Sequence, residues 1–155
     1  MVKRPNILFI MADDHASKAI GCYGHGINRT PNLDRIAAEG MRLNHCYVTN
    51  SICTPSRAAI LTGTYNHVNN VTTLDTPINS RGPNVAKHLR ATGYQTALIG
   101  KWHLGEGKAH EPSGFDFWSV LPGQGEYFDP YMIEMGREIE VPGYATDIIT
   151  DKSLD

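Results

Sequence analysis

A continuous apolar run over residues 7–11 constrains the fold more than any other feature of this sequence. Apolar residues without polar alternation suit a strand that is covered on both faces, as strands of parallel sheets are. Strand and helix signals then alternate along the chain: we expect helices over residues 31–39, 53–62 and 83–91, and strands over residues 41–49 and 94–99. This order predicts an α/β fold, in which a layered sheet carries helices on both faces.

The expected helices rest on local signals at their ends. Thr30 is a candidate N-cap, Pro31 suits the first helical position, and Gly40 suits the terminator. In the helix over residues 83–91, the side chains expected to face inward are Val85, Ala86 and Leu89. A last helical pattern over residues 145–155 takes Thr146 as its cap and reaches the end of the sequence without a C-cap, so we expect a truncated chain.

Composition predicts a soluble globular chain of about one domain. The chain has 155 residues, of which 41% are hydrophobic and 19% charged, and its formal net charge is -2. This balance speaks against nucleic acid as a partner, and no stretch is long enough to span a membrane. Three cysteines are an odd number at scattered spacings, so no disulfide framework is expected, and Cys22 and Cys46 are predicted to be small packing residues. Oligomeric state is not indicated.

The N-terminus does not read as a signal peptide, because its apolar stretch is short and runs straight into two aspartates. The localisation is not indicated: the chain as given fits the cytoplasm, and the periplasm or secretion if a leader was removed. Residues 100–143 hold eight of the 15 glycines and four of the nine prolines. The aromatic residues among them favour a structured loop region around a site.

Cys53 stands where the helix over residues 53–62 begins. A helix start presents unpaired N–H donors and the positive end of the helix dipole, and Arg57 adds a permanent charge, so an anion is favoured there. These features predict a reactive thiol. On the residues alone, a buried Cys ahead of an ordinary helix fits equally well.

Two further groups of residues suggest chemistry. Asp13 and Asp14 follow the expected strand over residues 7–11, at the edge where open α/β sheets bind ligands, and two adjacent carboxylates suit a hard cation. Lys101 and His103 follow the strand over residues 94–99; in extended geometry their side chains project the same way, with Trp102 packing on the other side. Taken alone, a solvated Asp-Asp turn and a surface loop are the commoner readings of these two patterns.

Four segments together resemble one protein family. The run CTPSRAAILTG over residues 53–63 is similar to the signature of the sulfatases, whose Cys is oxidised by a separate enzyme to formylglycine. Three other segments match in the family's order: PNILFIMADD at 5–14, TPNLD at 30–34 and GKWHLG at 100–105. The resemblance implies an alkaline-phosphatase-like α/β fold, with residues 1–155 as the N-terminal part of a sulfatase catalytic domain whose C-terminal part is absent.

The resemblance also implies a mechanism of sulfate ester hydrolysis. The hydrated formylglycine made from Cys53 attacks sulfur with one hydroxyl, and the other hydroxyl then expels sulfate. Arg57, Lys101 and the helix start neutralise the sulfuryl oxygens, and His103 is the candidate base for the elimination. The implied metal is Ca2+ in preference to Mg2+, bound by Asp13, Asp14 and the modified Cys53, with further ligands outside this chain. The implied partners are a sulfate ester and the formylglycine-generating enzyme.

Three alternatives stay open. A phosphonate or phosphodiester hydrolase of the same superfamily uses the same Cys-x-Pro-Ser-Arg site. A non-catalytic fragment keeps an unmodified Cys53 and binds metal weakly. A thiol hydrolase pairs Cys53 with His103. The identity of the ester, whether glycan, aryl or choline-type, is not readable from the sequence.

Overall fold

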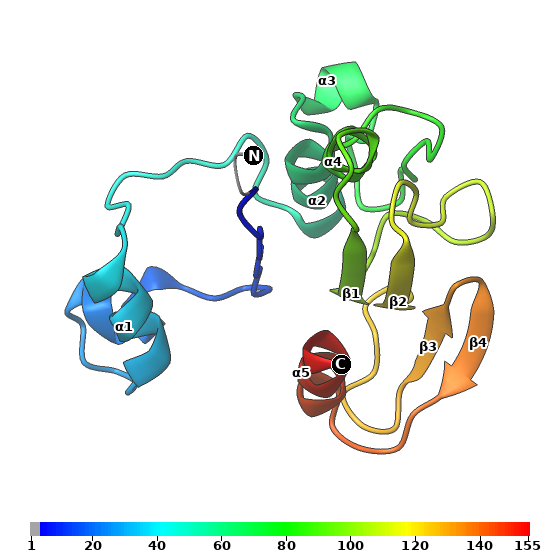
Figure 1. Ribbon diagram of the computed structural model, residues 1–155. Helices are drawn as coiled ribbons and strands as arrows, with labels where there is room; N and C mark the ends of the chain where they lie inside the picture. The colour runs from blue at the N-terminus through cyan, green and yellow to red at the C-terminus, as the bar shows by residue number, and fades with distance from the viewer. Residues whose placement is uncertain (1–3) are drawn as a thin grey trace. The chain divides into compact units, whose positions relative to one another are not determined.

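The computed structural model describes residues 4–155, which divide into two compact units. One unit ends at Tyr47 and the other spans Val48–Asp155; Figure 1 follows the chain through both. Among the described residues, no helix combines the length and the apolar character that crossing a bilayer requires.

The first unit is built around α1, Pro31–Glu39, with the single-turn 3-10 helices η1, Ser17–Ala19, and η2, Gly21–Tyr23. The prediction of a helix from Pro31 to a terminator at Gly40 is confirmed. Thr30 occupies the N-cap position, but its hydroxyl does not cap the helix. It donates instead to Asp34 Oδ1 (3.0 Å) and accepts from the N–H of Gly21 (2.8 Å). The Asp34 carboxylate also accepts from the N–H of Cys22 (2.6 Å), so the first turn of α1 anchors η2.

The second unit contains a sheet of four strands in the order β1-β2-β3-β4 (Figure 1). Its strands are β1, Ala97–Lys101; β2, Phe117–Leu121; β3, Tyr131–Glu134; and β4, Arg137–Glu140. β1 and β2 are parallel, and the other two pairings are antiparallel. The strand expected over residues 94–99 therefore begins three residues later. Three strands fall in the stretch over residues 100–143, which is structured as expected but is not a loop region alone.

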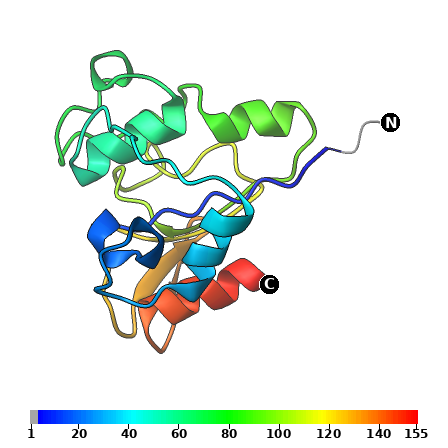
Figure 2. The same cartoon turned by 90° about the vertical axis from the view of Figure 1, so that its left-hand side faces the viewer.

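Helices cover both faces of this sheet, as Figure 2 shows. One face packs on α2, Cys53–Thr62, through an apolar cluster that includes Ala58, Trp102, Trp118 and Val120. The other face packs on α5, Ala145–Leu154, through Leu121, Met132, Ala145 and Ile148. Trp118 and Val120 of β2 belong to the first cluster and Leu121 to the second, because successive side chains of a strand point to opposite faces of the sheet. The predicted α/β fold with helices on both faces is confirmed.

Two expected strands do not form. Residues 7–11 form no strand, and Ile7, Leu8, Phe9 and Ile10 are exposed; residues 41–49 also form no strand. A strand needs a neighbour for its N–H and C=O groups, and the four strands of the described sheet pair only with one another. Apolar composition indicated burial but could not supply that neighbour. Cys46, expected to pack, is also exposed, while Cys22 is half-buried; all three cysteines are free thiols.

The remaining helices follow their sequence signals with shifts at their ends. The helix α4 spans Val85–Ala91 rather than beginning at Pro83, because the side chain of Asn84 caps it by accepting from the N–H of Lys87 (2.9 Å). Of its expected inward face, Ala86 is buried and Leu89 half-buried, but Val85 is exposed. The N-cap of α5 is Tyr144 rather than Thr146. The short α3, Asn66–Asn69, lies between α2 and α4 in the chain.

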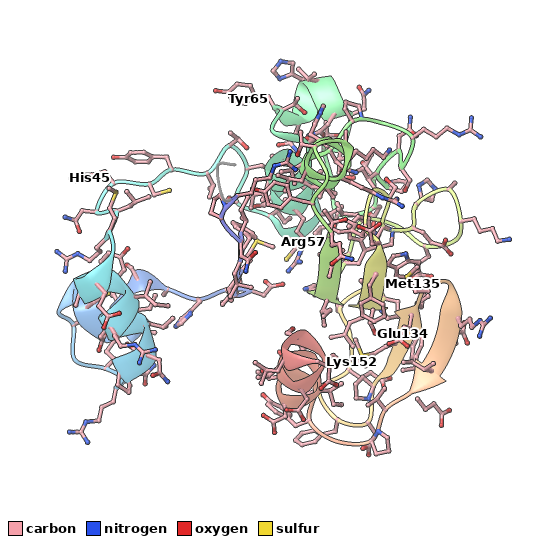
Figure 3. All side chains as sticks on the ribbon, in the orientation of Figure 1. His45, Arg57, Tyr65, Glu134, Met135 and Lys152 are labelled. Atoms are coloured by element: carbon pink, nitrogen blue, oxygen red, sulfur yellow. The ribbon has the colours of Figure 1, made fainter. Side chains whose placement is uncertain are left out.

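A partly buried ion pair ties α5 to the sheet. Lys152 Nζ lies 2.6 Å from Glu134 Oε2, and Figure 3 shows the two side chains pointing toward one another. The hydrogen bond from Lys152 holds the pKa of Glu134 below its usual value, although burial opposes this shift. A carboxyl whose pKa is lower in the folded state stabilises the fold above its unfolded pKa, and that stability is lost as pH falls through the folded pKa.

Substituting Glu134→Gln is therefore expected to lower the free energy of unfolding by about 0.5 kcal/mol at neutral pH, the range of a partly exposed ion pair. The difference from wild type should vanish at a pH below the folded-state pKa of Glu134, where the carboxyl is protonated in both states. Urea unfolding followed by circular dichroism measures it. Glu138→Gln, at an exposed position on β4, is the matched control and should change neither value. An equal loss at both pH values would mean that packing, and not charge, is responsible.

Candidate active site at the start of α2 and the end of β1

The start of α2 holds Cys53 at a fixed position. Cys53 is the first residue of the helix and is half-buried, whereas the next two residues, Thr54 and Pro55, are buried. The buried amide of Asn66 donates to the carbonyls of Pro55 (2.8 Å) and Val71 (2.7 Å), and these hydrogen bonds link the first turn of α2 to the segment at Val71. Gly63 ends the helix in the left-handed conformation that its predicted role as terminator requires. Cys53 therefore stands at a helix start where an anion is favoured.

Arg57 joins this helix to the sheet. Its Nη1 donates to the carbonyl of Lys101 at the end of β1 (2.7 Å), and Figure 3 labels Arg57 on α2 beside that strand. Cys53 and Arg57 are four residues apart and share one face of the helix. The structure thus brings the Cys53 helix and Lys101 together across a sequence separation that no local pattern encodes.

Gln124 is a residue of this site that the sequence analysis missed. Its Oε1 accepts a hydrogen bond from Lys101 Nζ (2.6 Å). It follows β2, whose end lies beside the end of β1, because Lys101 pairs with Leu121 in the parallel register. Gly123 and Gly125, both at positive φ, flank it. A polar residue between two glycines just after a strand was the signal that could have indicated a site residue.

The segment after Lys101 is anchored by Trp102. This side chain is buried, its Nε1 donates to the carbonyl of His110 (2.8 Å), and its N–H donates to the carbonyl of Leu121 (3.2 Å). The predicted packing role of Trp102 is confirmed. His103 is half-buried and has a φ of 52°, so the extended geometry assumed for Lys101 and His103 ends at His103. The backbone therefore does not support the prediction that the side chains of Lys101 and His103 project the same way.

Asp13 and Asp14 belong to the first unit, and the other proposed site residues belong to the second. Both aspartates are exposed and form a turn, in which Asp14 has a φ of 50°. Adjacent carboxylates are oxygen donors of the kind that Ca2+ prefers, so the donor chemistry fits a partial calcium site. Within residues 4–155 as described, no group of three or more His, Cys, Asp and Glu side chains is placed to hold a metal.

Comparison with known proteins decides the family. The family model "Sulfatase" matches residues 5–155. The chain belongs to the sulfatase family. It is 51% identical to an N-acetylglucosamine-6-O-sulfatase of Bacteroides thetaiotaomicron over 99% of this chain and 27% of that protein. It is 45% identical to human arylsulfatase A over 69% of this chain and 22% of that protein.

A solved structure shows the same fold. It is that of a protein in complex with its substrate D-glucosamine-2-N,6-O-disulfate, and it matches with a TM-score of 0.93 and 51% sequence identity. The match covers 98% of this chain and 31% of that one. The alkaline-phosphatase-like fold expected from the resemblance is therefore confirmed. This sulfatase chain spans between a fifth and a third of the length of these three relatives.

Proposed function

We propose that the natural protein carrying this sequence is a sulfatase that hydrolyses sulfuric esters, with Cys53 as the precursor of its nucleophile. The contact between Arg57 Nη1 and the Lys101 carbonyl supports this most directly, because it joins the helix start that bears Cys53 to the strand end that bears Lys101. The half-buried Cys53 then lies at a helix start, on the helix whose Arg57 guanidinium contacts the backbone of Lys101. This is the environment in which a group that carries negative charge on its oxygens is stabilised.

Each residue has a role in this proposal. Cys53, oxidised by a formylglycine-generating enzyme, supplies an oxygen nucleophile that regenerates after each turnover. Arg57 and Lys101 stabilise the charge on the sulfuryl oxygens, and the guanidinium also fixes the backbone of Lys101. Gln124 holds the Lys101 ammonium in place, and His103 accepts or holds a proton when sulfate leaves.

A divalent cation completes the proposed site. Asp13, Asp14 and the modified Cys53 would hold Ca2+, in preference to Mg2+, and a bound cation would add Lewis-acid stabilisation of the ester oxygens. Ligands beyond the two carboxylates and Cys53 would come from outside residues 1–155, which we propose are the N-terminal part of the catalytic domain.

The substrate class that we propose is a 6-O-sulfated glucosamine. Its basis is the 51% identity to the N-acetylglucosamine-6-O-sulfatase and to the protein solved with a disulfated glucosamine. Release of inorganic sulfate from 6-O-sulfo-N-acetylglucosamine, followed by ion chromatography, tests the proposal. We expect kcat/KM for this ester to exceed that for a matched phosphodiester or phosphonate monoester by at least about tenfold, because the sulfuryl group presents three terminal oxygens to the positive charges and the phosphorus esters present two. A preference for the phosphorus ester over every sulfate ester would contradict the proposal and favour the related hydrolases.

A further inference from the structure

The connections that flank β3 and β4 hold three aromatic rings at the surface of the second unit. Tyr127 and Phe128 lie in the connection after β2, and Tyr144 immediately precedes α5. The ring centroids of Tyr127 and Tyr144 are 6.5 Å apart with planes inclined by 15°, and the Phe128 ring lies 5.2 Å from that of Tyr144. We call these three residues the ring platform. Tyr127 is 72% exposed and Phe128 70% exposed in the second unit.

Backbone hydrogen bonds fix the ring platform in place. Phe128 and Tyr144 form an isolated antiparallel bridge, and the N–H of Ala145 donates to the carbonyl of Tyr127 (2.8 Å). The N–H of Asp129 donates to the carbonyl of Gly143 (2.8 Å), and Gly143 donates back to Asp129 Oδ1 (2.7 Å). Figure 1 shows the two connections running beside one another. The backbone that carries the rings is therefore held in place, and the rings contact one another without belonging to the apolar cluster beside α5, so the backbone needs little further ordering when a ligand stacks on them.

The ring platform lies close to the proposed site. Gln124, which contacts Lys101 Nζ, is in the same connection as Tyr127 and precedes it by three residues. Three residues span at most about 11 Å between Cα atoms. The connection leaves the carboxyl end of β2, the end at which Lys101 also lies. A molecule that extends from Lys101 along this connection therefore reaches the rings within a short distance.

The charges beside the rings limit which ligand fits. Glu126 and Asp129, both exposed, flank Tyr127 and Phe128 in the chain. Their carboxylates repel sulfate and accept hydrogen bonds from hydroxyl or amino groups. The face of an aromatic ring carries partial negative charge and attracts the polarised C–H groups of a pyranose. A sugar ring without sulfate satisfies both requirements, because its C–H face can stack while its edge donates hydrogen bonds.

We propose that the ring platform binds an unsulfated pyranose unit of the glycan whose sulfate ester is cleaved. This inference rests on the proposed function, since the glycan must reach Lys101. It assigns the protein a preference for oligosaccharides over monosaccharides, in which the unit on the platform is neutral or carries an amino group. The platform contributes binding, and the chemistry stays at Cys53.

The test compares two probes in the natural protein: 6-O-sulfo-N-acetylglucosamine, and an N-acetylglucosamine tetrasaccharide sulfated at O6 of its terminal unit only. Tyr127→Ala is expected to raise KM for the tetrasaccharide about tenfold, leaving kcat and both constants for the monosaccharide unchanged. Tyr127→Phe keeps the ring and should behave as wild type. Tyr65→Ala is the matched control, because Tyr65 is also exposed and stacks on His67 (5.8 Å between centroids), away from α5 in Figure 3.

Three outcomes would overturn the proposal. In the first, Tyr127→Ala changes KM for both probes equally. In the second, it changes KM for neither. In the third, sedimentation shows that the wild-type protein self-associates through Tyr127, while Tyr127→Ala leaves kcat and KM for the tetrasaccharide unchanged. Failure of the proposed function is distinguished by the monosaccharide, which wild type then does not hydrolyse. In that case calorimetry with the unsulfated tetrasaccharide decides: binding that Tyr127→Ala abolishes supports a sugar-binding platform, and no binding by wild type refutes it.

Discussion

Replacing Cys53 with Ala in the natural protein is expected to reduce sulfate ester hydrolysis by about a thousandfold or more, because it removes the nucleophile and not a contact to it. The loss should fall on kcat, since Arg57 and Lys101 still bind the sulfate. Initial rates of sulfate release from 6-O-sulfo-N-acetylglucosamine measure it. Cys22→Ala and Cys46→Ala are the controls: both positions are free thiols in the first unit and should retain wild-type rates.

Retention of more than about a tenth of the activity in Cys53→Ala would contradict the account. A loss in Cys46→Ala as large as that in Cys53→Ala would do so too, because the exposed thiol of Cys46 has no place in the mechanism.

Arg57→Ala and Lys101→Ala are each expected to lower kcat about a hundredfold or more, since each removes a positive charge that acts on the transition state. Gln124→Ala should cost less, about tenfold, because the Lys101 charge remains and only its hydrogen bond (2.6 Å) is lost. Arg57→Lys keeps the charge but not the planar guanidinium that reaches the Lys101 carbonyl, so it should restore only part of the activity.

The Arg57 and Lys101 effects should not add. Arg57 positions the backbone of Lys101, so the double variant is expected to lose less than the sum of the two single losses in free energy. Steady-state kinetics of the four proteins measures this coupling, and circular dichroism checks that each variant is folded. Strict additivity would show that Arg57 does not act through Lys101, and an unchanged kcat in either single variant would remove that residue from the site.

The helices could be predicted from the sequence because their signals are local. Pro31 and Gly40 bound α1, and Gly63 closes α2, each through backbone preferences of one residue. Strands have no equivalent local signal at their ends, because each forms only by pairing with another strand and the local sequence does not identify that strand. The apolar run over residues 7–11 has no partner strand in the described sheet. In contrast, β3 and β4 lie in a glycine-rich stretch whose composition did not indicate strands.

The residues of the proposed site likewise divide into those that a local motif indicates and those that only the fold brings together. Cys53, Arg57 and Lys101 were found through motifs, and the Arg57 contact to Lys101 then linked two of them across the fold. Gln124 was missed, because its position between two glycines after a strand is a weak signal and its contact with Lys101 depends on the pairing of β1 with β2. The positive φ of His103 occurs where the chain leaves β1, next to the buried Trp102, and no residue pattern indicated it.

Mass spectrometry of the tryptic peptide that spans Leu43 to Arg57 tests the central claim most directly. The protein is expressed with and without a formylglycine-generating enzyme, and Cys53 is compared with Cys46 in the same peptide. We expect Cys53 to be converted to the aldehyde only when that enzyme is present, and Cys46 to stay a thiol. A Cys53 that remains a thiol in the presence of the active enzyme would contradict the proposed nucleophile.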